Sequence, residues 1–229
     1  MIGLIDSGEG GVVTAEEIRS LSPNLDLTLL LDKKHAPYGK KTREELVELT
    51  RSNIERLVSL GASRVLLACC TASTVWENLP DEDRKISIPI LAPTAKRAVS
   101  VSQSGRIAVI ATEATVRSGK WTELLTPLST KELAAPELVA LTEGGACDEN
   151  ADEKLKTKIF EILTPLATHG ADTLVLGCTH FPRLAKTVKE TVKNFGIKYI
   201  VSSAKEGARE LMRTLGTNVT GHGQTVIIN

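Results

Sequence analysis

Short apolar runs alternate with amphipathic stretches along almost the whole of this 229-residue chain. The apolar runs predict buried strands, the last of them at a sheet edge, at residues 2–5, 27–31, 64–68, 86–91, 107–110, 138–141, 173–176, 198–201 and 225–228. Apolar residues at helical spacing predict helices at residues 15–21, 42–61, 151–169, 183–194 and 206–215. Because apolar strands that alternate with helices are typical of parallel sheets covered on both faces, the pattern predicts a layered α/β protein.

Local signals indicate where some of these elements begin and end. Thr42, followed three residues later by Glu45, forms a capping box that predicts the start of a helix, and Gly61 predicts its end. The polar residues 80–83 predict a loop before the fourth strand, and residues 111–115 predict a loop after the fifth.

Two segments of the chain are similar, which indicates a duplicated fold. Residues 61–69 and 170–178 each contain a Gly-Ala turn, an apolar strand and a final cysteine. These cysteines, Cys69 and Cys178, are 109 residues apart. A duplicated fold would put the two thiols at equivalent places on two half-molecules.

A second pair of strands repeats at nearly the same spacing, since residues 2–5 and 107–110 are 105 residues apart. We therefore expect two pseudo-symmetric α/β domains with mainly parallel sheets that face each other across a cleft. The first would comprise residues 1–94 plus 204–229, and the second residues 95–203. The active site would lie between them, because ligands of α/β folds bind beyond the carboxyl ends of the strands.

Composition and charge exclude some classes of function. Lys plus Arg and Asp plus Glu each number 28, and aromatic residues make up 3% of the chain, so the basic excess and the stacking platform of nucleic-acid binders are both missing. No apolar run approaches the ~20 residues that cross a bilayer, and the N-terminal run is too short for a signal peptide. The four cysteines include no CxxC pair, so no metal site is indicated. We expect a cytoplasmic protein that binds neither nucleic acid nor membrane.

A glycine-rich loop follows the first predicted strand, with the sequence Asp6-Ser7-Gly8-Glu9-Gly10-Gly11. Glycines allow a tight turn whose N–H groups point at an anion, and the following helix adds positive potential. The spacing G-x-G-G does not match the dinucleotide fingerprint, so carboxylate binding is favoured over a dinucleotide oxidoreductase. A plain turn without a ligand stays open, and Asp6 is a candidate base, thiol orienter or cap.

Cys69 and Cys178 are candidate acid–base groups. A lone cysteine is often only a small apolar residue, but the matched pair favours function, because a thiolate is a competent base and a thiol a competent acid. Facing thiols could remove a proton from one face of a carbon and return one to the other. His180 is a candidate to orient or acidify the Cys178 thiol, or else a histidine bonded to backbone. Cys70 could face the site or the core, and Cys147 has no assigned role.

Five segments, in order along nearly the whole chain, resemble the glutamate racemase branch of the aspartate/glutamate racemase superfamily. They are Asp6-Ser7-Gly8-Glu9-Gly10-Gly11, Pro37-Tyr38-Gly39, Ala68-Cys69-Cys70-Thr71-Ala72-Ser73, Ala111-Thr112-Glu113-Ala114-Thr115-Val116-Arg117-Ser118-Gly119 and Gly177-Cys178-Thr179-His180-Phe181-Pro182. The resemblance implies a racemase that uses two bases and no cofactor, with glutamate as substrate, D-glutamate for peptidoglycan as product, and a homodimer as the assembly.

The resemblance also implies roles for individual residues. Cys69 and Cys178 would be the bases, one for each enantiomer, and Asp6, His180 and Glu143 would assist them. The positions that match substrate-binding positions of the family are Ser7, Pro37, Tyr38, Gly39, Cys70, Thr71, Thr112, Thr115 and Thr179.

One departure from the family pattern leaves alternatives open. Cys70 stands where the family usually has an asparagine that contacts the substrate, and a thiol is a poorer hydrogen-bond partner. The substrate could therefore be aspartate or another acidic compound. A non-catalytic binding protein on the same scaffold is a further alternative, against which the two cysteines argue.

Overall fold

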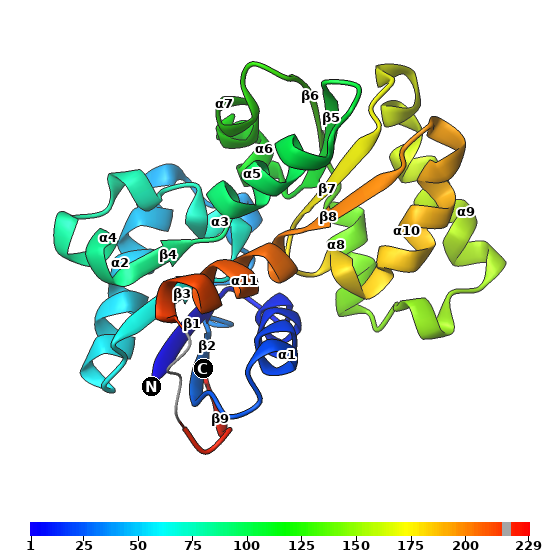
Figure 1. The fold of residues 1–229 in the computed structure, drawn as a ribbon. Helices are drawn as coiled ribbons and strands as arrows, with labels where there is room; N and C mark the ends of the chain where they lie inside the picture. Colours follow the sequence, from blue (N-terminus) through cyan, green and yellow to red (C-terminus); the bar gives the residue numbers. More distant parts are fainter. Residues whose placement is uncertain (217–220) are drawn as a thin grey trace.

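The computed structural model describes residues 1–216 and 221–229, and its strands form two sheets. The first sheet has the order β4-β3-β1-β2-β9, with β1 (Ile2–Asp6), β2 (Leu27–Leu31), β3 (Arg64–Leu67), β4 (Ser87–Pro89) and β9 (Thr225–Ile228). The second has the order β6-β5-β7-β8, with β5 (Arg106–Ala111), β6 (Ser129–Ala134), β7 (Thr173–Gly177) and β8 (Tyr199–Ser202). Strands that neighbour each other in these sheets run parallel, which confirms the predicted α/β class (Figure 1).

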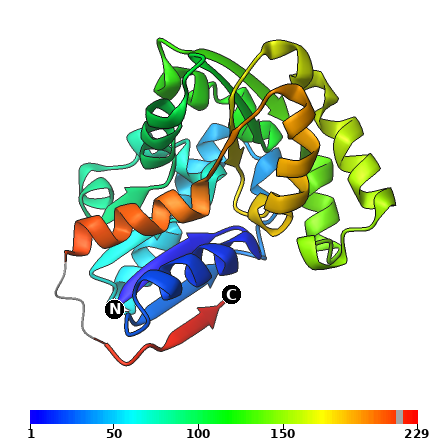
Figure 2. The same cartoon turned by 45° about the vertical axis from the view of Figure 1, so that its right-hand side comes forward.

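The two sheets share one topology. β1 lies between β2 and β3, as β5 lies between β6 and β7, and β4 and β8 occupy equivalent outer positions. The C-terminal strand β9 extends the first sheet beyond β2, at the edge that the sequence predicts (Figure 2). The exact domain boundaries stay a prediction, and residues 217–220 of the expected first domain lie outside the described residues.

Helices cover both sheets. The α-helices are α1 (Gly10–Leu21), α2 (Arg43–Ser59), α3 (Cys70–Ser73), α4 (Asp81–Ile86), α5 (Leu91–Val101), α6 (Glu113–Arg117), α7 (Lys120–Leu125), α8 (Pro136–Glu143), α9 (Glu153–Leu163), α10 (Ala185–Val192) and α11 (Ser203–Leu215). Short 3-10 helices are η1 (Tyr38–Lys40), η2 (Trp76–Asn78), η3 (Asp148–Asn150), η4 (Thr164–His169), η5 (Phe181–Leu184) and η6 (Lys193–Phe195). Helix α11 packs against α1 and α5 and so connects the two halves (Figures 1 and 2).

Alternating strand residues fill a core on each face of the sheets. In β2, Leu29 packs into the core that contains Ile18 of α1, whereas Leu30 packs into the core that contains Leu57 of α2. Because both faces of the strand are covered, every residue of β2 is buried, which explains why four of its five residues are leucine. The capping box predicted at Thr42 and Glu45 is present at the start of α2.

The predicted strand at residues 138–141 is wrong, because this segment lies in α8. Pro136 occupies its first turn, where proline is favoured, and Leu138 and Thr142, four residues apart, face the core. The strand of this region is β6, which the sequence does not reveal because its side chains are mostly half-buried and include charged residues.

Several other boundaries differ from the prediction. The predicted loop at residues 80–83 forms the first half of α4, whose first turn carries three acidic residues that suit a helix N-terminus. The predicted strand at residues 86–91 shrinks to β4. Helix α5 was not predicted, and α1 begins at Gly10, inside the predicted glycine loop. Helix α6 begins within the predicted loop at residues 111–115. The predicted helix at residues 151–169 continues beyond α9 only as the 3-10 helix η4, and α10 is shorter than predicted.

Candidate active site

Loops at the carboxyl ends of both sheets enclose a cavity of about 350 Å³. The predicted site residues that line it are Ser7, Pro37, Tyr38, Gly39, Cys69, Cys70, Thr71, Thr112, Glu143, Cys178, Thr179 and His180. They come from both halves of the chain, because the loops after β1, β2, β3, β5 and β7 converge there. Asp6 and Thr115 lie behind the wall, and both are fully buried.

Cys69 follows β3 and directly precedes α3, and its side chain is 5% exposed in the cavity wall. Its Sγ lies 3.7 Å from Ser7 Oγ. Burial is the main cause that raises the pKa of the Cys69 thiol to about 11, and the charge of Asp6 is the second. The N–H groups of Ala72 and Ser7 act in the opposite direction and favour the thiolate. Cys69 is therefore a neutral thiol at neutral pH.

Cys178 occupies the equivalent place after β7 and is also 5% exposed. Its Sγ lies 3.7 Å from His180 Nδ1. Burial raises the pKa of the Cys178 thiol, and negative charge on Cys69 raises it further. This mutual effect favours a state in which only one of the two sulfurs is ionised at a time.

His180 connects the Cys178 thiol to a carboxylate. Its Nε2 lies 3.5 Å from Glu143 Oε1, but the two are not aligned for a hydrogen bond, and Nε2 is buried without a hydrogen-bond partner among the described residues. Burial is the main cause that lowers the pKa of His180 to about 4, and the charge of Arg183 is the second. The imidazole is therefore neutral at neutral pH.

Asp6 links the two halves of the molecule. The Gly8 N–H donates to its Oδ1 at 2.9 Å, and the Thr179 hydroxyl donates to its Oδ2 at 2.9 Å. Burial outweighs these hydrogen bonds and raises the pKa of Asp6 to about 7. Gly10 is required for this contact, because a Cβ atom there would lie 2.8 Å from the Cβ of Thr179. The glycine loop thus packs closely against the segment that carries Cys178.

Three threonine hydroxyls form a triangle across the halves. Thr71 Oγ1 lies 2.9 Å from Thr112 Oγ1 and 3.1 Å from Thr115 Oγ1, and Thr112 Oγ1 lies 2.8 Å from Thr115 Oγ1. Thr71 and Thr112 line the cavity, whereas Thr115 supports them from behind. The arrangement fixes the two lining hydroxyls where they can bind a polar ligand group.

A buried network holds the wall formed by Tyr38. Its hydroxyl donates to Asp32 Oδ2 at 2.6 Å and accepts from Asn53 Nδ2 at 3.0 Å. Burial and the Asp32 carboxylate raise the pKa of Tyr38, so the hydroxyl stays protonated. The sequence interpretation missed Asp32 and Asn53, and the one signal for Asp32 is its place directly after a predicted strand.

Cys70 takes part in both the site and the core. It lines the cavity, is 2% exposed, and packs with Ile90, Leu91 and Trp121. Burial raises the pKa of its thiol well above the ordinary value. Cys147 is not among the residues that line the cavity.

The sequence interpretation also missed part of the lining, namely Ala36, Lys40, Glu113, Pro136, Val139 and Ala140. Three of these lie on α8, which is the segment wrongly predicted as a strand. Pro136, at the first turn of that helix, is the signal that could have found them.

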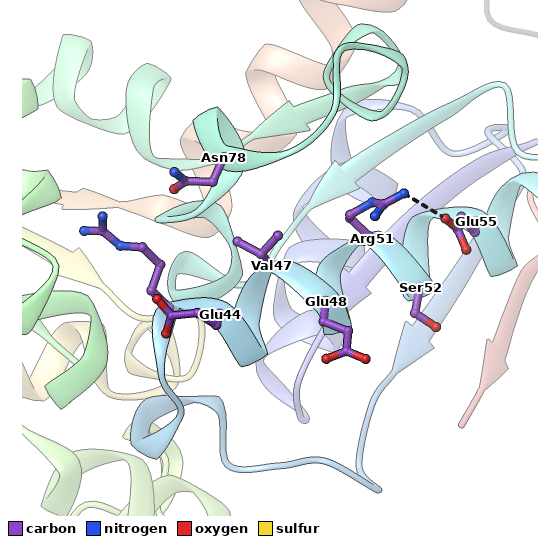
Figure 3. A pocket seen from close by; sticks show the side chains of 8 residues that line it. Glu44, Val47, Glu48, Arg51, Ser52, Glu55 and Asn78 are labelled. Atoms are coloured by element: carbon purple, nitrogen blue, oxygen red, sulfur yellow. Dashed lines mark ion pairs between the residues drawn. The ribbon is translucent and has the colours of Figure 1, made fainter.

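A second hollow, of about 580 Å³, runs along α2 and contains none of the predicted site residues. Figure 3 shows the side chains that line it, most of which, such as Glu44, Glu48 and Arg51, come from α2, while Asn78 comes from η2. Arg51 pairs with Glu55 at 3.5 Å and with Asp83 at 3.3 Å. No cysteine or histidine is among the described residues that line this hollow.

Two kinds of feature do not occur in residues 1–216 and 221–229. They contain no group of three or more His, Cys, Asp or Glu side chains arranged to hold a metal ion. They also contain no helix that is both long enough and apolar enough to span a membrane.

Comparison with known proteins agrees with the fold. The family model for Asp/Glu/hydantoin racemases matches residues 15–211. A glutamate racemase of Desulforudis audaxviator is 36% identical over 196 residues, which cover 83% of this chain and 71% of that protein. The crystal structure of a glutamate racemase isoform from Bacillus anthracis superposes with a TM-score of 0.84 at 27% identity, over 99% of this chain and 86% of that one.

A glutamate racemase of Escherichia coli, solved in complex with L-glutamate and the activator UDP-MurNAc-Ala, is 26% identical with a TM-score of 0.77, over 99% of this chain and 87% of that chain. The family match covers most of the chain, and the relatives are aligned over most of their own length. The chain therefore belongs to the Asp/Glu/hydantoin racemase family. As an enzyme it is an amino-acid racemase, which is an isomerase.

Proposed function

We propose that the protein interconverts L- and D-glutamate, with Cys69 and Cys178 acting on opposite faces of the α-carbon. The observation that carries this proposal is that both thiols line one cavity, each after the equivalent strand of a duplicated topology. The relatives named glutamate racemase support glutamate as the substrate.

Each turnover would move two protons. One cysteine, as thiolate, takes the α-proton: the Cα–H bond breaks, an S–H bond forms, and the electron pair of the broken bond spreads into the α-carboxylate. The other cysteine, as thiol, then gives its proton to the opposite face of the α-carbon and becomes the thiolate. The reverse reaction exchanges the two roles, so each cysteine serves one enantiomer as base.

Forming the first thiolate is costly in this site. With a pKa of about 11, ionising Cys69 at pH 8 costs about 4 kcal/mol. The ammonium group of a bound amino acid lowers this cost, because a nearby positive charge favours the thiolate. Beside Cys178, His180 has a pKa too low to take the thiol proton but can orient the sulfur through Nδ1, which lies 3.7 Å away, whereas Asp6 with its pKa near 7 can exchange protons at neutral pH.

The carbanion-like intermediate needs stabilisation where its charge develops, which is on the α-carboxylate. Hydroxyl groups of Ser7, Thr71 and Thr112 line the cavity and can donate hydrogen bonds to carboxylate oxygens, whereas the Thr179 hydroxyl already donates to Asp6. Thr71 and Thr112 are already fixed by their mutual hydrogen bond, so little reorganisation is required as charge builds up. Cofactor-free proton abstraction depends on this preorganisation.

The product D-glutamate would supply peptidoglycan synthesis, as the family resemblance implies. The homodimer implied by the same resemblance stays a prediction, which light scattering of the purified protein tests.

Proton exchange with solvent tests the proposal directly. Incubation with L- or D-glutamate in D₂O should replace the α-proton by deuterium, and the optical rotation of either enantiomer should decay to zero. Cys147→Ala, outside the cavity, should behave as the wild-type enzyme. Absence of exchange with both glutamate enantiomers would reject glutamate as the substrate, and exchange with aspartate alone would identify aspartate as the substrate.

A further inference from the structure

The cavity that holds the two thiols is lined by more acidic than basic side chains. Glu113 and Glu143 line it, and His180 contributes no positive charge because burial lowers its pKa to about 4. Among the described residues, Lys40 is the one lysine or arginine in the lining. A dicarboxylic amino acid carries a net negative charge, so a site lined by carboxylates would repel it without a compensating cation.

Lys40 is held in position by the wall on which it stands. It ends η1, which begins with Tyr38, and Asp32 and Asn53 fix the hydroxyl of that tyrosine. Gly39, the residue between, contacts the second half so closely that a Cβ atom there would lie 3.2 Å from Thr112 Cβ. The backbone that carries Lys40 is therefore anchored on both sides of the cavity.

The ammonium group of Lys40 is uncommitted. The side chain is exposed at the rim of the cavity, and no ion pair of Lys40 occurs in the part of the chain that the structure describes. The Lys40 ammonium can therefore form an ion pair with a carboxylate of the ligand.

We propose that Lys40 is a specificity-determining residue, whose ammonium attracts a dicarboxylic substrate and holds one of its carboxylates at the open side of the cavity. The inference rests on the proposed function in that the substrate has two carboxylates. Because Lys40 is exposed, its attraction is screened by solvent and acts on association and affinity. The proton transfers take place at the sulfurs and do not involve it.

The neighbouring Lys41 provides a matched control. It has the same charge, does not line the cavity, and its Nζ lies 3.9 Å from Glu45 Oε1. Lys40→Gln and Lys41→Gln therefore remove the same net charge from the same short segment, and only the position relative to the cavity differs.

The test is calorimetric binding of glutarate, which has two carboxylates and no stereocentre, so that binding is measured without turnover. In about 0.02 M salt, Lys40→Gln should raise the Kd of glutarate by about 3- to 10-fold, and this ratio should approach one in about 0.5 M salt because the screening length shortens. Lys41→Gln should leave the Kd unchanged, and Lys40→Arg should keep wild-type affinity. In racemisation assays the KM for glutamate should rise in parallel, with kcat unchanged.

Three results would overturn the inference: equal Kd values for Lys40→Gln and Lys41→Gln, a loss of affinity that persists at high salt, or a wild-type protein that does not bind glutarate. Melting temperatures of the variants exclude unfolding as the cause. A Lys40 effect on glutarate binding without racemisation of glutamate would reject the proposed function and leave dicarboxylate recognition standing.

Discussion

Replacing Asp6 by asparagine should stabilise the folded protein at alkaline pH while it abolishes most activity. The carboxyl group is fully buried, and burial raises its pKa from 3.8 to about 7 in spite of hydrogen bonds from Gly8 and Thr179. In the unfolded chain the pKa returns to its ordinary value. Between pH 4 and pH 7, roughly, the native state therefore holds a proton that the unfolded state has released.

The sign and size of the effect follow from this difference. Because the native state binds more protons, the free energy of unfolding falls as the pH rises from about 4 to about 7, and then levels. A span of about three pH units at about 1.4 kcal/mol each gives a loss of about 4 kcal/mol. Asparagine has the same shape and carries no charge, and it can accept from the Gly8 N–H and donate to the Thr179 hydroxyl. The free energy of unfolding of Asp6→Asn should therefore not fall over this pH range.

Urea unfolding at pH 5 and pH 8 measures the effect. The stability of Asp6→Asn relative to the wild type should increase by about 3 kcal/mol between these pH values. Asp172→Asn is the pH-independent control: although burial tends to raise the pKa of Asp172, hydrogen bonds such as those from the N–H groups of Gln103 and Ser104 lower it to about 2, so that variant should lose the same stability at pH 5 and at pH 8. A difference between Asp6→Asn and wild type that is equal at both pH values would refute the reasoning.

Two further substitutions test how the halves and the cavity wall are held. Gly10→Ala should lower the free energy of unfolding in urea by about 1–3 kcal/mol and raise KM, because the new methyl group would lie 2.8 Å from Thr179 Cβ. An unchanged urea midpoint would contradict the close packing. Asp32→Ala should lower the free energy of unfolding by about 2–3 kcal/mol, since it removes the carboxylate to which the buried Tyr38 hydroxyl and the Asn53 amide donate. A loss within about 0.5 kcal/mol, as for a surface substitution, would show that the network is not needed.

The strands that sequence reasoning finds most easily are those buried on both faces. β1, β3, β5 and β7 lie inside their sheets, and each contains a run of consecutive buried residues without a charged side chain. β6 lies at an edge and carries charged residues, so periodicity alone misses it, whereas the apolar run inside α8 resembles a strand in composition. The internal repeat holds the missing information: β2, shifted by 105 residues, falls on residues 132–136 and overlaps β6.

The candidate site was predictable where chemistry follows directly after a strand. Cys69 and Cys178 carry that signal, and the structure brings both into one cavity. Asn53 and Lys40 do not carry it, and Asp32, although it follows a predicted strand, owes its importance to contacts between segments far apart in the sequence, as the other two do. Such contacts exist only after the chain has folded, so one sequence without its structure does not reveal them.

The central claim is that the two sulfurs serve opposite faces of one carbon atom, and single-cysteine variants test it most directly. Deuterium uptake at the α-carbon should be followed in D₂O for each pure glutamate enantiomer with Cys69→Ala and with Cys178→Ala. Each variant should fail to racemise but should exchange one enantiomer with retention, and the two variants should exchange opposite enantiomers. Racemisation at the wild-type rate by either variant, or exchange of the same enantiomer by both, would contradict the two-base account.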